Sequence, residues 1–589
     1  MNVLRLLTVI VSSTIAGLVS ARAVLTLFEP VYETWEIAPW RVVIFSLVFI
    51  ASFALFFYQM VYERPSFLSF LKRPIHLVVI AILTYLFYFS TVGEMVHLEE
   101  EGSIGPVPII IIAVLTYVLL IWAVMYRMIA TDWHMYWKKN QPSPWTIVYF
   151  GLPIVLIGFI YWIGFFPGPM TPDSFHHWRQ SLDYDFSNWH PMIYTVLTIV
   201  LTSFWDNPAV VTLFQVLFIG AVWGYTMFSL RRIGLPHIAL IVATTIVTII
   251  PITGIYAVTF WKDVLYSVLL LLFTVYFMNI VISKGTWLAV WRNVILLTVT
   301  MLALAFFRNN GLPIVLVSLI ALGLMHLKYW RAIVVPIVVT FVTYIVVTGP
   351  IFSALDVNAA QSIESLSIPH QQIGYILNDE DGTLTEQQAA KLDYFMPVDA
   401  WKEAYHPFLS DHIKFHPELD RDRLADDIPG YIGTWAGIVG NNFGLAVEGY
   451  LYQTSIVWQI HEPNRAYTAS YASQVMDNPH GLEMSPLSEP VHQGLLSYLT
   501  FTDEQLLELI WRPALFILLI LLATSAGTLK NGLRFLIIST PVILNWGTML
   551  AAIPAQDFRY MLPNFFILFV IVLLAFGKFK LEIKQEDLH

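Results

Sequence analysis

Runs of hydrophobic residues, separated by short polar stretches, recur along most of this 589-residue chain. A helix of about 20 apolar residues is long enough to cross the hydrocarbon core of a bilayer. The pattern therefore predicts about 14 membrane-spanning helices. We expect them at 3–28, 40–62, 75–96, 106–127, 144–166, 208–230, 236–256, 262–283, 288–307, 311–327, 331–351, 507–527, 534–553 and 561–577.

Lysine and arginine residues follow every second predicted helix, which sets the expected orientation. Positive residues mark the cytoplasmic side of a membrane protein. Arg231 and Arg232 stay on that side only if the apolar segment 191–205 does not span. We therefore expect this segment to be a short helix at the outer membrane surface, with both chain termini in the cytoplasm.

The region 352–506 lacks a spanning window and is rich in Asp, Glu, His and Pro. Its length is sufficient for a hydrophobic core of its own. The predicted fold class is an all-α polytopic membrane protein with a mixed, mainly helical extracytoplasmic domain. We divide the chain into a four-helix N-terminal extension (1–143), a transmembrane core (144–351) with an outer loop (166–207), the extracytoplasmic domain (352–506), and C-terminal helices with a short cytoplasmic tail (507–589).

The composition agrees with a membrane protein and excludes several classes of function. Hydrophobic residues make up 57% of the chain and charged residues only 12%. The net charge of −10 argues against nucleic-acid binding, which requires a basic surface. Because the chain has no cysteine, disulfides, zinc-thiolate sites and thiol nucleophiles are excluded.

Four polar segments lie at predicted helix ends, all on the expected outer side. Ionisable groups at the edge of a membrane are costly to hold there, so they are candidates for function. The four segments contribute Asp173, His176, His177, Gln180 and His190; Lys262 and Asp263; Arg308, Asn309 and Asn310; and Arg559 and Tyr560. Acids paired with fixed cations suit an anionic lipid head group and an acceptor that loses a proton.

Each segment also has a purely structural interpretation, which stays open from the sequence alone. Asp173 in Pro-Asp-Ser has the residue type of a helix N-cap. Lys262 and Asp263 are also compatible with an ion pair whose charged ends reach the membrane interface by snorkelling. Arg308 and Arg559 suit anchors at the level of the lipid head groups.

The arrangement resembles the GT-C superfamily of integral-membrane glycosyltransferases, which use polyprenyl-phosphate-linked sugars. Within it, the chain is similar to a bacterial group of GT-C-like proteins, over roughly 150–589. The resembling pieces are Pro172-Asp-Ser174, His190-Pro191, Arg308-Asn-Asn-Gly311, Ile368-Pro-His-Gln-Gln372, Ser410-Asp-His-Ile-Lys414 and Arg559-Tyr560. Asp173 takes the place of the key acid of the superfamily's first outer loop, and Asp263 that of a second acid. The loop departs from the pattern because it lacks two adjacent acids, which puts a metal-dependent mechanism in doubt.

The resemblance implies an inverting glycosyltransferase in a bacterial plasma membrane, with its active site facing outward. The donor would be a polyprenyl-phosphate-linked sugar, and the acceptor an envelope glycan, polymer or lipid, in contact with membrane lipids. The expected catalytic residues are Asp173 as general base, Asp263 and His190. The expected ligands of the donor phosphate are Arg308, Arg559, Lys262 and Tyr560. The expected acceptor or sugar contacts are His176, His177, Gln180, Asn309, Asn310, Gln371 and Gln372. A divalent cation, Mg²⁺ or Mn²⁺, stays open as a cofactor, without assigned ligands.

Two further functions are compatible with many helices and polar breaks. One is a transporter or flippase for a lipid-linked envelope precursor, and the other is a scaffold for envelope synthesis. A transporter is expected to have paired halves and polar breaks near the bilayer midplane. The polar groups of this chain gather at one predicted surface instead, which favours the enzyme.

Overall fold

The chain is almost entirely helical in the residues that the structure, a computed structural model, describes: 3–26, 39–92, 106–358, 362–462 and 468–580. Nine helices in these residues are long and apolar enough to cross a membrane, and the bent pair α10–α11 adds a tenth if it counts as one span. The predicted all-α, multi-pass membrane protein is therefore confirmed. The ends of two predicted helices, 27–28 and 93–96, lie outside the described residues.

The main helices before residue 352 are α1 (Val3–Thr26), α2 (Pro39–Tyr62), α4 (Pro74–Val92), α5 (Pro106–Ala130), α6 (Trp145–Gly164), α7 (Pro172–Asp183), α8 (Met192–Thr202), α9 (Ala209–Ile233), α10 (His237–Ile249), α11 (Pro251–Val258), α12 (Lys262–Ile282), α13 (Trp291–Phe307), α14 (Gly311–Met325) and α15 (Trp330–Val346). After residue 488 come α25 (Glu489–Gln505), α26 (Ala514–Asn531), α27 (Leu533–Ala552) and α28 (Leu562–Ala575). Short connecting elements are α3 (Arg64–Ser69), α16 (Phe352–Ala354), the π-helical turns Val347–Ile351 and Leu507–Trp511, and the 3₁₀ turns Phe70–Lys72, Thr286–Ala289, Leu327–Tyr329, Ser362–Ser365 and Phe558–Met561.

A helix occurs at each predicted position, but the described residues do not show about 14 spans. The helices α13 and α14 contain 17 and 15 residues, so each is about 22–26 Å long, less than a typical hydrocarbon core of about 30 Å. In α1 and α5, the apolar stretches that the structure describes are also short, Leu6–Leu18 and Tyr117–Ala130.

The helix predicted at 236–256 is broken by a bend of 58° between α10 and α11. Pro251 begins α11 and has no N–H to continue the helical hydrogen bonds. The residue before it, Ile250, has φ −59° and ψ 128°, the extended conformation that a following proline favours. The bend directs α11 toward the end of the bundle that carries α7 and α8.

Helix α8 is short, as predicted for segment 191–205. Its 11 residues rise only about 16 Å, about half of a typical hydrocarbon core. The side chain of Tyr194, on α8, donates a hydrogen bond to Gln215 of α9. Gln215 in turn donates to the carbonyls of Ala257 and Thr259, so α8 is fixed to the segment between α11 and α12.

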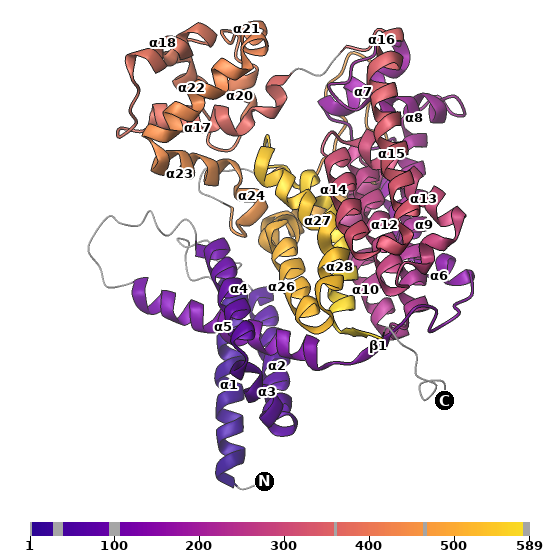
Figure 1. Ribbon diagram of the computed structural model, residues 1–589, viewed down its shortest axis with the longest axis vertical. Helices are drawn as coiled ribbons and strands as arrows, with labels where there is room; N and C mark the ends of the chain where they lie inside the picture. The colour runs from indigo at the N-terminus through magenta and orange to yellow at the C-terminus, as the bar shows by residue number, and fades with distance from the viewer. Residues whose placement is uncertain (1–2, 27–38, 93–105, 359–361, 463–467, 581–589) are drawn as a thin grey trace.

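Helix α12 is the central element of the membrane part (Figure 1). It is almost completely buried, and it packs against α9, α13, α27 and α28. Leu, Val, Phe and Tyr occur all around it, which is typical of a helix enclosed on every side. Its N-terminal residues, Lys262 and Asp263, are buried despite their charges.

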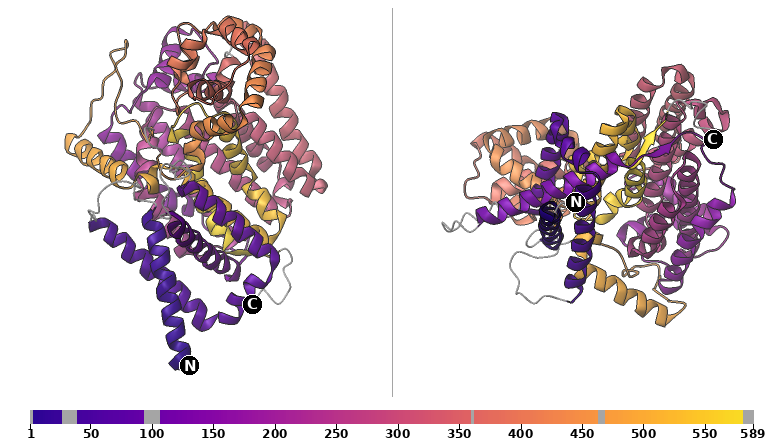
Figure 2. Two further views of the ribbon diagram at one scale, coloured as in Figure 1. Left: turned by 90° about the vertical axis from the view of Figure 1, so that its left-hand side faces the viewer. Right: turned by 90° about the horizontal axis from the view of Figure 1, so that it is seen from below.

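A helical unit with its own hydrophobic core lies beside the membrane helices, at the end that carries α7 (Figures 1 and 2). Its core runs from Ile363 to Ala446 and includes Trp401 and Tyr431. Its elements are α17 (Ser367–Asn378), α18 (Glu386–Phe395), α19 (Val398–Ala404), α20 (Asp411–Lys414), α21 (Arg421–Asp426), α22 (Ile428–Asn441) and α23 (Phe443–Gln453). The short helix α24 (Ser455–Trp458) follows, and its Ile456 and Val457 pack with Met549 and Ile553 instead.

The second half of the region predicted as one domain, 352–506, runs along the membrane helices instead of this unit. The backbone N–H groups of Ser485 and Leu487 donate to the carbonyls of Phe166 and Ile163. Val475 forms a bridge with Met170. Helix α25 then packs against α6. The hydrophobic core of the helical unit therefore includes only the first part of this region, up to Ala446.

The opposite end of the bundle carries a two-stranded parallel sheet of β1 (Trp133–Met135) and β2 (Gly577–Phe579). Trp133 pairs with Gly577, so the segment that precedes α6 is joined to the segment that follows α28.

Helices α6 and α9 approach each other closely because glycine residues face each other between them. A Cβ atom on Gly151 would lie 2.5 Å from the carbonyl oxygen of Gly220. Gly220 and Gly224 form a Gly-x-x-x-Gly motif, which lets helix backbones approach within a membrane.

We expect Gly151→Ala to lower the free energy of unfolding by about 1–3 kcal/mol, because the added methyl group overpacks this contact. Gly547→Ala, on α27, is the matched control, since no atom lies within 4 Å of its added methyl group. It should be neutral or stabilising by about 0.5–1 kcal/mol. Thermal unfolding in detergent checks both values. Equal midpoints for the two variants would contradict the close packing of α6 on α9.

Candidate active site

Seven ionisable side chains from five segments converge at one end of the bundle, and we call them the charged cluster. They lie at the starts of α7, α8 and α12, at the end of α13, and in the loop between α27 and α28. The charged cluster consists of Asp173, His190, Lys262, Asp263, Arg308, Asp557 and Arg559.

The start of α7 is fixed to the start of α12, which places Asp173 in the cluster. Thr171 and Ser174 form a capping box, so Thr171 is the N-cap of α7. The Ser174 hydroxyl donates to the Phe260 carbonyl at 2.8 Å, and the Trp261 indole donates to the Thr171 hydroxyl at 2.8 Å. The structural alternative for Asp173, an N-cap, is therefore wrong. Its carboxylate is left to contact cations.

Gly168 permits the tight approach of this loop to α11. Its φ of +123° lies in a region that favours glycine. A Cβ atom there would lie 2.5 Å from the Val258 carbonyl oxygen.

Asp173 lies among two cations and a histidine. Arg559 Nη1 donates to Asp173 Oδ2 at 2.7 Å, and Lys262 Nζ lies 3.8 Å from the same oxygen. His190 Nε2 lies 3.4 Å from Asp173 Oδ1, and its Nδ1 lies 3.3 Å from Lys262 Nζ. Asp173, His190 and Lys262 therefore form a continuous polar chain.

Asp263 and Asp557 each hold a cation of the charged cluster. Arg308 Nη1 lies 2.8 Å from Asp263 Oδ1, and Lys262 Nζ lies 3.9 Å from Asp263 Oδ2. Arg559 Nε lies 2.7 Å from Asp557 Oδ2, while the backbone N–H of Arg559 donates to Asp557 Oδ1. Lys262 and Arg559 thus each contact two carboxylates.

Aromatic rings cover the arginines of the cluster. The Arg559 guanidinium lies 4.8 Å from the centre of the Trp261 ring and 5.2 Å from that of Tyr560. The Arg308 guanidinium lies 5.2 Å from Tyr560 and 5.5 Å from Tyr266. Tyr560 therefore lies between the two arginines, and cation–π attraction adds to their ion pairs.

The charged cluster is electrically balanced and mostly withdrawn from solvent. Its side chains are only 3–25% exposed. Three aspartates face one lysine and two arginines, and buried charges of opposite sign compensate one another. The more exposed end of the cluster lies at Asp173, which is 25% exposed, whereas Asp263 is 3% exposed.

The pKa values of groups outside the membrane helices follow from this arrangement. Burial by itself would raise the pKa of Asp173, but Arg559, the hydrogen bond from His190, and Lys262 together hold it well below its usual value. Burial and Lys262 lower the pKa of His190, against the opposing effect of Asp173. Burial raises the pKa of Asp557 to about 6, partly offset by Arg559. At neutral pH, Asp173 and Asp557 are therefore mainly charged and His190 is neutral.

The charged cluster does not fit a divalent cation. No group of three or more His, Asp or Glu side chains in the part of the chain that the structure describes has metal-ligand geometry. Asp173, Asp263 and Asp557 each contact an arginine already, so their oxygens serve guanidinium groups. We therefore derive no step through a metal.

An apolar pocket of about 210 Å³ lies next to the charged cluster. Its lining includes Pro191 and Asn309, the chain neighbours of His190 and Arg308. Most of its wall comes from α8, α13, α15 and the π-helical turn Val347–Ile351, and Phe352 of α16 also lines it. The wall residues Val196 and Ile351 are about 40% exposed, so the pocket is open toward the apolar surface of the bundle.

The other predicted residues of the first loop have partners within the loop or in α8. His177 is fully buried and shares a hydrogen bond of 2.8 Å with the Thr195 hydroxyl. Gln180 binds His176 and accepts from the Ser187 N–H. His176 itself lies at the edge of the cluster, with its ring centre 5.1 Å from that of His190. Burial lowers the pKa of His176 to about 4, so this ring is neutral as well.

The remaining predicted acceptor contacts are not gathered at the charged cluster. Asn310 donates to Thr548 of α27, whereas Asn309 is exposed and lines the apolar pocket. Gln372 donates to the Ala446 carbonyl within the helical unit. Gln371 is buried in the same unit and has no hydrogen-bond partner among the described residues.

Three residues at the cluster have no predicted role. Trp261 and Asp557 belong to two of the four polar segments at predicted helix ends, whereas Tyr266 lies outside these segments. Asp557 lies two positions before Arg559, and Trp261 directly precedes Lys262. Tyr266 lies one helical turn after Lys262, so it shares a helix face with that residue. Sequence proximity was therefore a usable signal for each of them.

Comparison with known proteins identifies the family of this multi-pass membrane protein. Residues 106–587 match a family of unknown function, DUF6020, and the chain belongs to that family. The match covers all elements of the charged cluster and excludes α1, α2 and α4. No curated protein and no solved structure matches the chain.

The Asp263–Arg308 pair should contribute strongly to stability. We expect Asp263→Asn to lower the free energy of unfolding by about 3–5 kcal/mol, because the buried Arg308 would lose its main carboxylate partner. Arg308→Gln should have a similar effect. The double variant should lose less than the sum, with a coupling energy of about 1–3 kcal/mol in a double-mutant cycle.

Arg179 and Asp183 of α7 provide the control cycle. Their side chains are about half exposed and their charged atoms are 3.7 Å apart. A coupling energy below about 0.5 kcal/mol is expected for this pair, because water screens it. Chemical unfolding in detergent micelles measures both cycles. A coupling for Asp263–Arg308 as small as that of the control would contradict the described ion pair.

Proposed function

We propose that this protein is a GT-C-type glycosyltransferase that transfers a sugar from a polyprenyl-phosphate donor to a cell-envelope glycan, polymer or lipid acceptor. The observation that carries the proposal is the charged cluster beside an apolar pocket. A lipid phosphate needs cations for its head group and an apolar surface for its chain. An acceptor hydroxyl needs a positioned base.

In the proposed reaction, Asp173 is the general base. It takes the proton of the acceptor hydroxyl while the hydroxyl oxygen attacks the anomeric carbon of the donor sugar. The bond between that carbon and the phosphate oxygen breaks, and its electron pair stays on the polyprenyl phosphate. Attack from the face opposite the phosphate inverts the configuration at the anomeric carbon.

The cations of the cluster stabilise the charge that develops on the leaving phosphate. Arg308, Lys262 and Arg559 come from three different segments, so they can surround one phosphate. Asp263 and Asp557 hold Arg308 and Arg559 in place before the substrate binds. Such preorganised charges do not need to rearrange during the reaction.

The ion pair of Asp173 with Arg559 couples donor binding to base strength. Without substrate, Arg559 holds the pKa of Asp173, against the opposing effect of burial, well below its usual value, so Asp173 is a weak base. A phosphate that binds Arg559 competes with Asp173 for this guanidinium. The pKa of Asp173 then rises, and the carboxylate becomes a better proton acceptor when the donor is bound.

The proposal includes about 14 spans, both termini in the cytoplasm, and the charged cluster at the outer surface of a bacterial plasma membrane. The alternation of positive residues along the sequence supports this orientation. The helical unit at 363–446 would then be extracytoplasmic and adjacent to the acceptor side.

A transporter or flippase is less well supported. The broken helix α10–α11 is a feature that transporters share. However, no charged residue lies in either half of it. The ionisable groups gather at the helix ends around Asp173 instead of at the middle of the bundle.

We expect Asp173→Asn to reduce sugar transfer by about 10²–10⁴-fold, the typical contribution of a general base. Binding of polyprenyl phosphate should be retained or tightened, because Arg559 loses a competing carboxylate. Transfer from a radiolabelled polyprenyl-phosphate sugar in detergent measures the first effect, and lipid titration measures the second. Arg179→Gln on the same helix is the control and should transfer normally. Full transfer by Asp173→Asn would overturn the base assignment.

The apolar pocket beside the cluster should hold the donor chain next to its phosphate. We expect Val196→Trp to raise the KM for a polyprenyl-phosphate sugar, because the indole fills the pocket wall. Val200→Trp lies one turn further on α8, is similarly exposed, and does not line the pocket. Its KM should match the wild type. Equal KM values for both variants would show that the donor chain lies elsewhere.

A further inference from the structure

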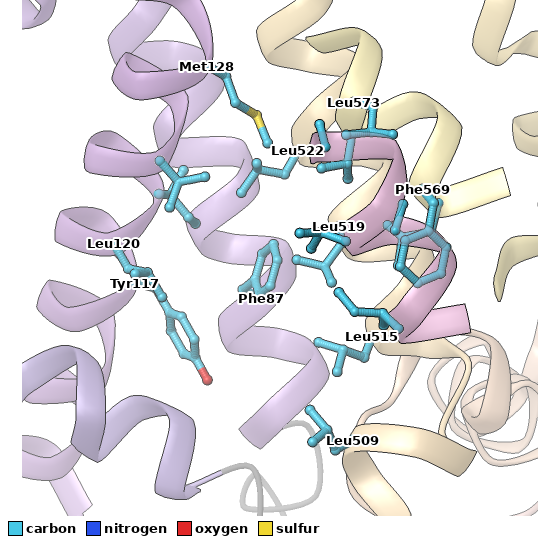
Figure 3. A pocket seen from close by; sticks show the side chains of 18 of the residues that line it. Phe87, Tyr117, Leu120, Met128, Leu509, Leu515, Leu519, Leu522, Phe569 and Leu573 are labelled. Carbon is cyan, nitrogen blue, oxygen red and sulfur yellow. The ribbon is translucent and has the colours of Figure 1, made fainter. Parts of the chain in front are cut away.

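A second and larger apolar cavity lies between the N-terminal helices and the core. Its volume is about 660 Å³. Helices α4 and α5 form one wall, and α10, α26 and α28 form the others (Figure 3). Among the side chains drawn there, the Tyr117 hydroxyl and the Met128 sulfur are the only atoms other than carbon.

The cavity has a buried floor and an exposed rim. Phe87, Ile121 and Leu522 on the floor are at most 8% exposed. Ile238 and Val242 of α10 line the same cavity and are 67% and 49% exposed. Because α26 and α28 are long enough to cross a membrane, this rim lies beside the hydrocarbon of a bilayer.

The chemistry of the wall excludes a polar occupant. A buried water molecule needs two to four polar partners, and this wall offers only the Tyr117 hydroxyl, which already donates to Thr91. A charged head group would find no counter-ion, since no charged residue lines the cavity. The occupant is therefore a hydrocarbon.

The size of the cavity favours a single chain. At about 30 Å³ for a small group such as a water molecule, or a methylene of similar size, the cavity holds roughly 20 groups. A membrane-spanning helix about 10 Å wide and about 30 Å long fills roughly 2,400 Å³, so it does not fit.

We propose that this cavity binds an acyl chain of a bilayer phospholipid, whose head group stays outside it. Helix α5 packs directly against α26, whereas α10 faces α5 across the cavity. The acyl chain completes the packing between α5 and α10 and so joins the N-terminal helices to the core. This site is separate from the pocket beside the charged cluster and does not depend on sugar transfer.

The test uses the full chain in vesicles of phosphatidylethanolamine and phosphatidylglycerol that contain a phosphatidylcholine with a diazirine on its acyl chain. Irradiation attaches the probe to nearby residues, which mass spectrometry then locates. We expect adducts on the floor residues Ile121, Met128 and Leu522, which bulk lipid does not reach. Labelling there no stronger than at Leu270, inside α12, would overturn the proposal.

Two tryptophan variants on α10 test whether the labelled lipid chain occupies the cavity itself. Ala239→Trp fills the cavity and should reduce labelling of the floor by more than half, while Thr245→Trp, exposed and outside the lining, should leave it unchanged. Val242→Phe is the alternative cavity-filling variant if Ala239→Trp does not fold.

Equal labelling of the cavity-filling and control variants would overturn the proposal. So would loss of the adducts on adding polyprenyl phosphate, because the occupant would then be a polyprenyl chain.

Discussion

The ion pair between Asp173 and Arg559 is the interaction on which the rest of the site depends. It joins residues that are 386 positions apart, one at the start of α7 and the other just before α28. Both side chains are mostly buried, and neither charge could be withdrawn from water without the other. The start of α7 and the loop between α27 and α28 are therefore held together by the need to compensate buried charge. Lys262 and His190 complete the same polar chain.

The position of α12 makes this compensation feasible. It is enclosed by α9, α13, α27 and α28, and it begins with Lys262 and Asp263 at the centre of the cluster. Asp263 lies in the first helical turn, where the N–H groups of the helix also favour a negative charge. A rigid, fully packed helix thus carries two of the seven ionisable groups. The others approach it from loops whose backbones are fixed by hydrogen bonds, such as that from Ser174 to Phe260.

Stability and chemistry place opposite demands on these residues. The aspartates neutralise the cations and stabilise the fold. In the proposed reaction, a phosphate would compete with them for the same guanidinium groups. The two carboxylates differ in exposure, and this difference separates the two demands. Asp263 is nearly inaccessible and keeps Arg308 in place, whereas Asp173 is the most exposed carboxylate of the charged cluster. The aromatic rings of Trp261 and Tyr560 hold the arginines while their carboxylate partners change.

The hydrophobic runs of the sequence are enough to predict a multi-pass helical membrane protein, because the length of a hydrophobic run is a local property. The sequence also indicates Asp173, Lys262, Asp263, Arg308 and Arg559 as candidate site residues, because charges at the ends of apolar helices are conspicuous in the pattern. Only the tertiary structure decided which charges pair, that Asp557 shares Arg559, and that Gln371 and Gln372 lie in the helical unit instead of the cluster. Ion pairs across 386 residues depend on how helices pack, and no local pattern encodes that. The sequence pattern predicts one helix over 236–256, whereas the structure bends it by 58° at Pro251.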